Sequence, residues 1–149
     1  MPVENKLTNK NILILSSYIK LMRAAESVTA RGHQHLSQVK LSFSQFAVLE
    51  VLNHHGPLCQ RDIAGKILKS QRNITMVIDN LEKRKLVRRE RNAEDRRYII
   101  VHLTEEGRTL FKQIIPRHIN SLVEEMGILS ETELKELSRL CRILGKRER

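Results

Sequence analysis

Apolar side chains recur at helical spacing along most of this chain, and this pattern predicts a mainly helical protein. A long first helix is expected over about residues 7–35, because no Gly or Pro interrupts it before Gly32. A second helix is expected to begin at Ser42, whose spacing from Gln45 is a capping-box pattern, and to end at the Gly56-Pro57 stop signal. A short third helix is expected over residues 60–68.

The fourth expected helix has a sharp division between its two sides. It begins at Ser70, a favourable N-cap, and its apolar positions follow the i, i+3, i+4, i+7 pattern. These apolar positions are Ile74, Val77, Ile78 and Leu81. At about 100° per residue, the opposite side carries Arg72, Met76, Asp79 and Lys83.

Two short strands are expected next, over about residues 86–91 and 98–103, joined by a charged tip. The fifth helix is capped by Thr104 and contains Pro116, which is expected to bend or break it because proline removes one backbone donor. The last helix is expected to begin at Ser130 with Glu133 as its capping-box partner, and its apolar stripe includes Cys141 as an ordinary core residue. The expected fold class is mainly α with a small β-wing.

The charge balance indicates what the protein binds. Lys and Arg number 27 against 17 Asp and Glu, so the 149-residue chain carries a net charge of +10. The excess is concentrated in residues 83–97, where eight basic and three acidic side chains give +5. A surplus of this kind favours a polyanionic partner, with nucleic acid first and an anionic membrane second.

The order of elements predicts a winged helix-turn-helix, in which a tight helix pair precedes a two-stranded hairpin. Residues 70–84 would be the recognition helix, since polar side chains of its first turns are donors and acceptors that read base edges in the major groove. These side chains are Gln71, Arg72, Asn73, Thr75 and Met76. The alternative is an ordinary solvated helix face, and the basic hairpin that follows the helix argues against it.

The hairpin over residues 86–103 would be the wing. Arg96 and Arg97 at its tip are expected to contact phosphates or to enter the minor groove, where the negative potential favours a guanidinium. Asp95 is expected to pair with Arg97 and to hold it in one rotamer. The alternative is a charged surface turn. The complete predicted DNA-binding set is Ser70, Gln71, Arg72, Asn73, Thr75, Met76, Lys83, Arg89, Arg91, Asp95, Arg96 and Arg97.

Two segments resemble the MarR (multiple-antibiotic-resistance regulator) family. Residues 81–107, LEKRKLVRRERNAEDRRYIIVHLTEEG, are similar to the family's recognition-helix end and wing, with the Asp-x-Arg signature at Asp95 and Arg97 and the Leu-Thr and nearby Gly at Leu103, Thr104 and Gly107. Residues 41–67 resemble its second and third helices. The resemblance spans nearly the whole chain, and its wing motif is more specific than its helices.

The resemblance implies a homodimer on a pseudo-palindromic operator of double-stranded DNA, with intertwined first, fifth and sixth helices. It also implies a repressor that is released by a small anionic aromatic effector or by cysteine oxidation. The corresponding domains are a dimerisation helix over 1–35, the DNA-binding domain over 36–108 and dimerisation helices over 109–149. Two positions depart from the family pattern: Lys85 replaces the usual Gly, which suggests a different cap, and Cys59 replaces a Ser or Thr cap.

No enzyme, cofactor or metal site is expected. The sequence has no nucleophile–base motif or phosphate loop, and its two cysteines and six histidines show no metal-ligand spacing. His118 is expected to be a satisfied interhelical histidine, with a cavity-lining or intersubunit metal role as the alternative. Because the sequence shows no signal peptide and no membrane-spanning apolar run, a cytoplasmic location is expected.

Three alternatives to a ligand-responsive repressor stay open. The first is a redox- or metal-responsive regulator of the same fold, in which Cys59 at a helix N-terminus has thiolate character. The second is a basic protein that binds nucleic acid without base preference, which the varied polar side chains of residues 71–76 argue against. The third is a sensor module whose main role is to bind a ligand or metal.

Overall fold

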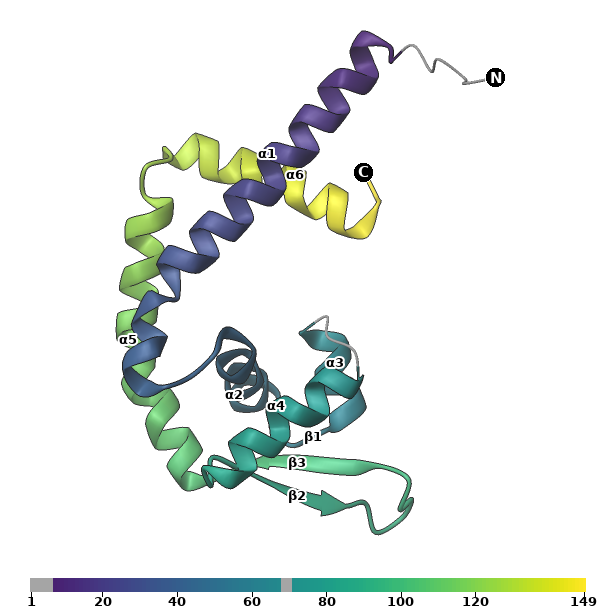
Figure 1. Ribbon diagram of the computed structural model, residues 1–149, viewed down its shortest axis with the longest axis vertical. Helices are drawn as coiled ribbons and strands as arrows, with labels where there is room; N and C mark the ends of the chain where they lie inside the picture. The colour runs from purple at the N-terminus through teal and green to yellow at the C-terminus, as the bar shows by residue number, and fades with distance from the viewer. Residues whose placement is uncertain (1–6, 68–70) are drawn as a thin grey trace. The chain divides into compact units, whose positions relative to one another are not determined.

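The computed structural model describes residues 7–67 and 71–149; for residues 71 and 72 only the backbone is described. It confirms the expected fold class, because the described chain is mainly helical and carries one small antiparallel sheet (Figure 1). In chain order the elements are α1 (Asn9–Gly32), the 3₁₀ helix η1 (Gln34–Val39), α2 (Phe43–His55), β1 (Leu58–Cys59), α3 (Gln60–Lys66), α4 (Gln71–Lys83), β2 (Val87–Arg91), β3 (Ile99–Leu103), α5 (Glu105–Met126) and α6 (Glu131–Lys146).

The chain divides into two compact units. One comprises Met1–Gly32 and Asn120–Arg149, and the other comprises His33–Ile119. Helix α5 begins in the second of these units and ends in the first. The dimerisation role expected for residues 1–35 and 109–149 stays a prediction.

The unit His33–Ile119 is built around one apolar core that α2, α3, α4 and the sheet share. The sheet has the strand order β1-β3-β2, and Val87 pairs with Leu103 while Arg91 pairs with Ile99. The apolar stripe predicted for α4 is buried here, because Ile74, Ile78 and Leu81 are fully inaccessible. The fully buried side chains of this core are Leu36, Phe46, Val48, Leu49, Leu52, Ile63, Ile74, Ile78, Leu81, Val87 and Val101.

Both predicted capping boxes are present. The Ser42 hydroxyl accepts from the Gln45 N–H at 3.1 Å, and the Gln45 side chain accepts from the Ser42 N–H at 2.9 Å. Ser130 and Glu133 make the equivalent pair at 3.2 and 2.7 Å. Each box satisfies two backbone donors that a helix start leaves unpaired, so α2 and α6 begin where the sequence predicted.

The cap after α4 differs from the expectation. Lys85 adopts the left-handed conformation that favours glycine, with φ 61°, so the sequence-based suggestion of a different cap is wrong. Its N–H donates to the Glu82 carbonyl at 2.9 Å, and the Leu86 N–H donates to the Leu81 carbonyl at 3.0 Å. The Thr104 hydroxyl also donates to the Lys85 carbonyl at 2.7 Å. These bonds offset the roughly 1–2 kcal/mol that a non-glycine residue loses in this conformation.

The expected extent of the first helix is also wrong, since α1 ends at Gly32 and the chain enters η1. Leu36 of η1 turns into the core and is 2% exposed, which a continued α1 would not provide. The end of η1 is held by the Arg84 guanidinium, which donates to the carbonyl oxygens of Val39 at 3.0 Å and Lys40 at 2.7 Å. Contacts with residues distant in sequence therefore decide this boundary.

Two further differences concern Pro116 and β1. Helix α5 continues through Pro116, so the expected break is absent, and the expected bend stays a prediction. Both Pro116 and Lys112, whose carbonyl loses its helical donor, are exposed, so water can satisfy that carbonyl. Strand β1 was not predicted, because a strand of two residues has no detectable alternation; it pairs with β3 through Leu58 and Val101.

The unit that contains α1 and α6 leaves large apolar side chains uncovered. Within it, Arg31 of α1 pairs with Glu125 of α5 at 2.7 Å. Helix α6 has no buried residue in this single chain, and Cys141, expected in the core, is exposed. The exposed large apolar side chains of α1 and α6 are Ile12, Leu13, Ile14, Leu15, Tyr18, Ile19, Leu21, Met22, Leu140 and Leu144.

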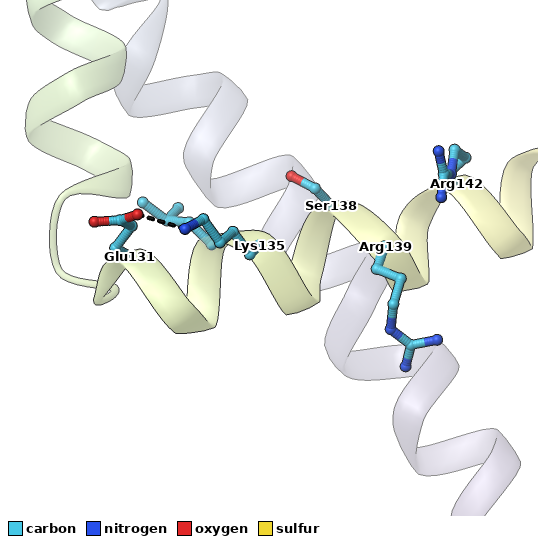
Figure 2. A pocket seen from close by; sticks show the side chains of 6 residues that line it. Glu131, Lys135, Ser138, Arg139 and Arg142 are labelled. Atoms are coloured by element: carbon cyan, nitrogen blue, oxygen red, sulfur yellow. Dashed lines mark hydrogen bonds and ion pairs between the residues drawn. The ribbon is translucent and has the colours of Figure 1, made fainter.

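The other side of α6 is polar. Figure 2 shows Glu131, Lys135, Ser138, Arg139 and Arg142 along an open hollow of about 440 Å³, with a bond between Glu131 and Lys135. Since every residue that lines it belongs to α6, the hollow is the solvent-facing flank of one helix. Helix α6 thus has one polar and one apolar side, and on the apolar side Leu140 and Leu144 are exposed in the single chain.

Candidate nucleic-acid interface

The polar side of α4 is exposed as predicted. Asn73, Thr75, Met76 and Lys83 lie at the surface, and the Met76 side chain is 61% exposed. Because the buried stripe of α4 fixes its rotation, these side chains point away from the core. Gln71 and Arg72 begin the helix but their side chains are not described, and Ser70 lies outside the described residues.

The start of α3 supports α4 through a residue that the sequence-based prediction missed. The Gln60 side-chain NH₂ donates to the Thr75 hydroxyl at 2.8 Å, so the two helices are joined on the exposed side. The Gln60 side-chain oxygen, Oε1, is buried and has no hydrogen-bond partner among the described residues. No local pattern indicates this contact, because glutamine at the start of a helix is common and Thr75 is fifteen residues away.

The wing presents Arg97 in a fixed orientation. Its guanidinium forms a two-pronged ion pair with Asp95, at 2.7 Å from Nη2 to Oδ2 and 3.0 Å from Nε to Oδ1. The Arg97 backbone N–H also donates to Asp95 Oδ1 at 3.1 Å. The hydrogen bonds from Arg97 lower the pKa of Asp95, so the carboxylate stays charged. The expected ion pair is therefore present, and the Arg97 side chain is still 83% exposed.

Backbone and side-chain bonds order the rest of the wing tip. The Asn92 side chain accepts from the Glu94 N–H at 2.9 Å, which closes an Asx-type turn. Arg91 donates to the Arg96 carbonyl at 3.0 Å, and the Tyr98 N–H donates to the Asp95 carbonyl at 3.1 Å. Arg91 and Arg96 are exposed, so the tip presents cations on a turn with defined geometry.

Arg89 is placed differently from the other predicted wing residues. Its side chain is 21% exposed and pairs with Asp79 of α4. Its backbone N–H donates to Glu82 of the same helix at 2.9 Å. The structure thus brings Arg89 against α4, whereas Arg91, Arg96 and Arg97 are open to solvent. The sequence feature that could have indicated this packing is the pair of acidic residues Asp79 and Glu82, three apart on α4 and close in sequence to the basic segment 83–97.

A hollow joins the exposed side of α4 to the wing. It has a volume of about 310 Å³ and brings Thr75 of α4 and Arg97 of the wing to one surface, although the two are far apart in sequence. Cys59, the N-cap residue that precedes α3, also lines it and is half-buried. Its side chain makes no cap hydrogen bond, in agreement with the weakened cap expected for cysteine there. Helix and wing therefore form one continuous surface.

The part of the chain that the structure describes, residues 7–67 and 71–149, also contains the buried histidine His118. His118 packs against Phe46 with ring centroids 4.4 Å apart, and its Nδ1 lies 3.3 Å from His35 Nε2. The described residues contain no group of three or more His, Cys, Asp or Glu arranged to hold a metal ion. Within these ranges, no helix has the length and apolar character needed to cross a bilayer.

Comparison with known proteins agrees with this architecture. A family model with the description "Transcriptional regulator SarA/Rot" matches residues 31–114 of this chain. The HTH-type transcriptional regulator MhqR of Bacillus subtilis (strain 168) is 34% identical over 131 residues, which cover 88% of this chain and 90% of that protein.

Two solved structures have the same fold. Bordetella bronchiseptica BpsR, described for regulation of its DNA binding by 6-hydroxynicotinic acid, is 28% identical with a TM-score of 0.81, over 87% of this chain and 98% of its own. AbsC, a MarR family transcriptional regulator from Streptomyces coelicolor, is 22% identical with a TM-score of 0.83, over 95% of each chain. The family match covers the core, recognition helix and wing, and with the identity to MhqR it shows that the chain belongs to the MarR-like SarA/Rot family of winged helix-turn-helix transcriptional regulators.

Proposed function

We propose that this regulator is a homodimer that binds a pseudo-palindromic operator, with α4 in the major groove and the wing on the adjacent minor groove or backbone. The observation that carries the proposal is the shared surface of Thr75 and Arg97. Polar and apolar contacts from α4 supply base discrimination, and arginine on the wing supplies attraction to DNA. The DNA contacts expected of the other residues in the predicted set stay predictions, except for Arg89, which packs against α4.

A selection experiment tests the function directly. Duplexes bound from a random pool should converge on a sequence with two related half-sites, because a symmetric dimer presents the same surface twice. Competition at fixed salt should then show tighter binding to the selected duplex than to random DNA, since the non-specific term is shared by both. Equal affinities would favour a basic protein without base preference.

Loss of the wing arginine is expected to weaken operator binding. Arg97→Ala removes an exposed guanidinium that Asp95 orients, and we expect a loss of operator affinity of more than about ten-fold. Electrophoretic mobility shift or fluorescence anisotropy titration at fixed salt measures the change. The circular dichroism spectrum should be unaltered, because the side chain is 83% exposed. Wild-type affinity in a folded variant would contradict the wing's proposed role.

The uncovered apolar sides of α1 and α6 support dimerisation. A single chain that exposes so many large apolar side chains on two helices gains by covering them, since apolar burial contributes roughly 25 cal/mol per Å². A second copy of the chain is the occupant that the proposed twofold operator requires. The dimer would then place two copies of α4 and the wing on successive turns of DNA.

A charge on the apolar side of α6 is expected to weaken the dimer. Leu140→Asp should raise the dimer dissociation constant by at least about ten-fold, because the interface would bury an unpaired carboxylate. Ser138→Asp is the matched control: it adds the same charge to the same helix on the polar side shown in Figure 2. Sedimentation equilibrium measures both. An unchanged constant for Leu140→Asp would exclude α6 from the interface.

The effector and the direction of regulation are further parts of the proposal. BpsR is described as regulated by 6-hydroxynicotinic acid, and this supports a small anionic aromatic effector that releases a repressor from its operator. Titration of phenolic and aromatic carboxylate compounds into the operator complex tests it. A cytoplasmic location, where chromosomal DNA is accessible, follows from the proposed function and stays a prediction.

A further inference from the structure

Helix α4 carries two carboxylates on the side that faces the wing, and both engage one residue of β2. Asp79 accepts from the Arg89 guanidinium, and Glu82 accepts from the Arg89 backbone N–H at 2.9 Å. The strand is therefore held to the helix twice at a single position, once through its main chain and once through a side chain. These two contacts link the recognition helix directly to the base of the wing.

The surroundings of Arg89 do not suit a phosphate contact. Its side chain is 21% exposed, compared with 58% for Arg88 on the same strand and 83% for Arg97 at the tip. Arg89 Nε is buried and has no hydrogen-bond partner in the described chain. Because the guanidinium already pairs with a carboxylate, its charge is largely neutralised before DNA approaches.

We propose that Arg89, Asp79 and Glu82 are positioning residues that fix the angle between the recognition helix and the wing. This inference rests on the proposed function, and it replaces the sequence-based expectation that Arg89 contacts DNA. The wing tip lies beyond Arg89 along β2, so a small rotation at the clamp becomes a larger displacement at Arg97. Hydrogen bonds weaken over a few tenths of an ångström and at poor angles, so the clamp sets whether helix and wing reach DNA together.

The clamp should affect specific binding and leave non-specific binding intact. Random DNA is bound through phosphates in many registers, whereas the operator requires α4 and the wing to be in register at once. A positioning residue therefore contributes to the ratio of operator affinity to random-duplex affinity. A phosphate-contacting residue contributes to both affinities and to their salt dependence.

Asp79→Ala is the decisive variant. It removes the partner of Arg89 and makes the DNA-binding surface more positive by one charge, while alanine favours the helix. We expect operator affinity to fall about ten-fold, although affinity for a random duplex stays equal or rises. Opposite changes of this kind cannot arise from charge alone, because added positive charge strengthens both kinds of binding.

Glu94→Ala is the matched control. It removes one carboxylate from the wing, and the Glu94 side chain makes no hydrogen bond or ion pair within residues 7–67 and 71–149. Both affinities should stay equal or rise together, so the operator-to-random ratio should not change. A ratio that falls equally in Glu94→Ala and Asp79→Ala would overturn the inference, since it would reflect the wing's charge.

Arg89→Met supplies a second measurement that does not depend on the first. A logarithmic plot of random-duplex affinity against salt should keep its wild-type slope, because Arg89 makes no phosphate contact. Arg91→Met, an exposed arginine of the same strand, should reduce the slope magnitude by about 0.9 if it contacts one phosphate. A reduction of that size in Arg89→Met, or wild-type operator affinity in Asp79→Ala, would overturn the positioning role.

Failure of the proposed function can be distinguished from failure of the positioning role. If the proposed function were wrong, the wild-type protein itself would show no preference for any duplex.

Discussion

Replacing Gly107 with alanine is expected to lower the free energy of unfolding by about 3 kcal/mol, a large loss for an overpacking substitution. A Cβ at Gly107 would lie 2.1 Å from the Leu86 carbonyl oxygen and 2.8 Å from Leu103 Cδ1. The carbonyl cannot move aside freely, because it accepts the Thr104 N–H at 3.1 Å. The start of α5 therefore packs directly on the backbone at the base of the wing, and only a residue without Cβ fits.

Gly65→Ala is the control within the same unit. Gly65 lies in α3, and a Cβ there would meet no heavy atom within 4 Å. Alanine should raise stability by roughly 0.5 kcal/mol, because it restricts the unfolded chain more than glycine does. Urea unfolding at one fixed protein concentration measures both variants, since dimerisation would make the midpoint depend on concentration. A Gly107→Ala variant as stable as the wild type would contradict the close packing.

Acid is expected to destabilise the protein through His118 by up to about 3.5 kcal/mol. The side chain is 7% exposed, and burial, with His33 and His35 nearby, lowers the pKa of His118 from 6.5 to about 4. Between these two values the unfolded chain binds a proton that the folded chain excludes, so stability falls as the pH decreases. Well above pH 6.5 both states are neutral at this position and the contribution is constant. A shift of about 2.5 pKa units at roughly 1.4 kcal/mol each gives the stated magnitude.

The His118 contribution is isolated by a non-titrating variant. His118→Gln keeps a polar group near His35 but does not protonate. Between pH 7 and pH 4.5 the wild type should lose about 2.5 kcal/mol more unfolding free energy than the variant, as measured by urea unfolding. Carboxylate titrations, including that of Asp95, occur in both proteins and cancel in this comparison. Equal losses in the two proteins would show that His118 protonates without cost in the folded state.

The elements that could be predicted are those determined by neighbours in sequence. The buried stripe of α4 follows from apolar side chains one turn apart, and the two capping boxes follow from residues three apart. The Asp95–Arg97 pair spans two residues, so it too was within reach of the pattern. The exposed predicted contacts on α4 and the wing tip follow from these same local rules.

The errors occur where a distant residue decides the outcome. The first helix was expected to continue past Gly32, but the core takes Leu36 and Arg84 binds the end of η1 from a separation of more than forty residues. Lys85 adopts the left-handed conformation that glycine usually occupies. A hydrogen bond from the distant Thr104 hydroxyl to the Lys85 carbonyl helps to hold it there. The pairing of Arg89 with Asp79 was likewise beyond the sequence, because it depends on how β2 packs on α4. That Arg89 makes no DNA contact is part of our proposal.

The sequence by itself determined the order of the helices, the starts of α2 and α6, the charged wing and the family to which the chain belongs, because periodicity, capping and motif spacing act over a few residues. Only the tertiary structure decided which cations are presented and which are used internally, since that depends on the carboxylates that packing brings near them. It also decided that Gly107 must be glycine and that His118 is buried. These results come from close packing between segments far apart in the chain, which no local pattern encodes.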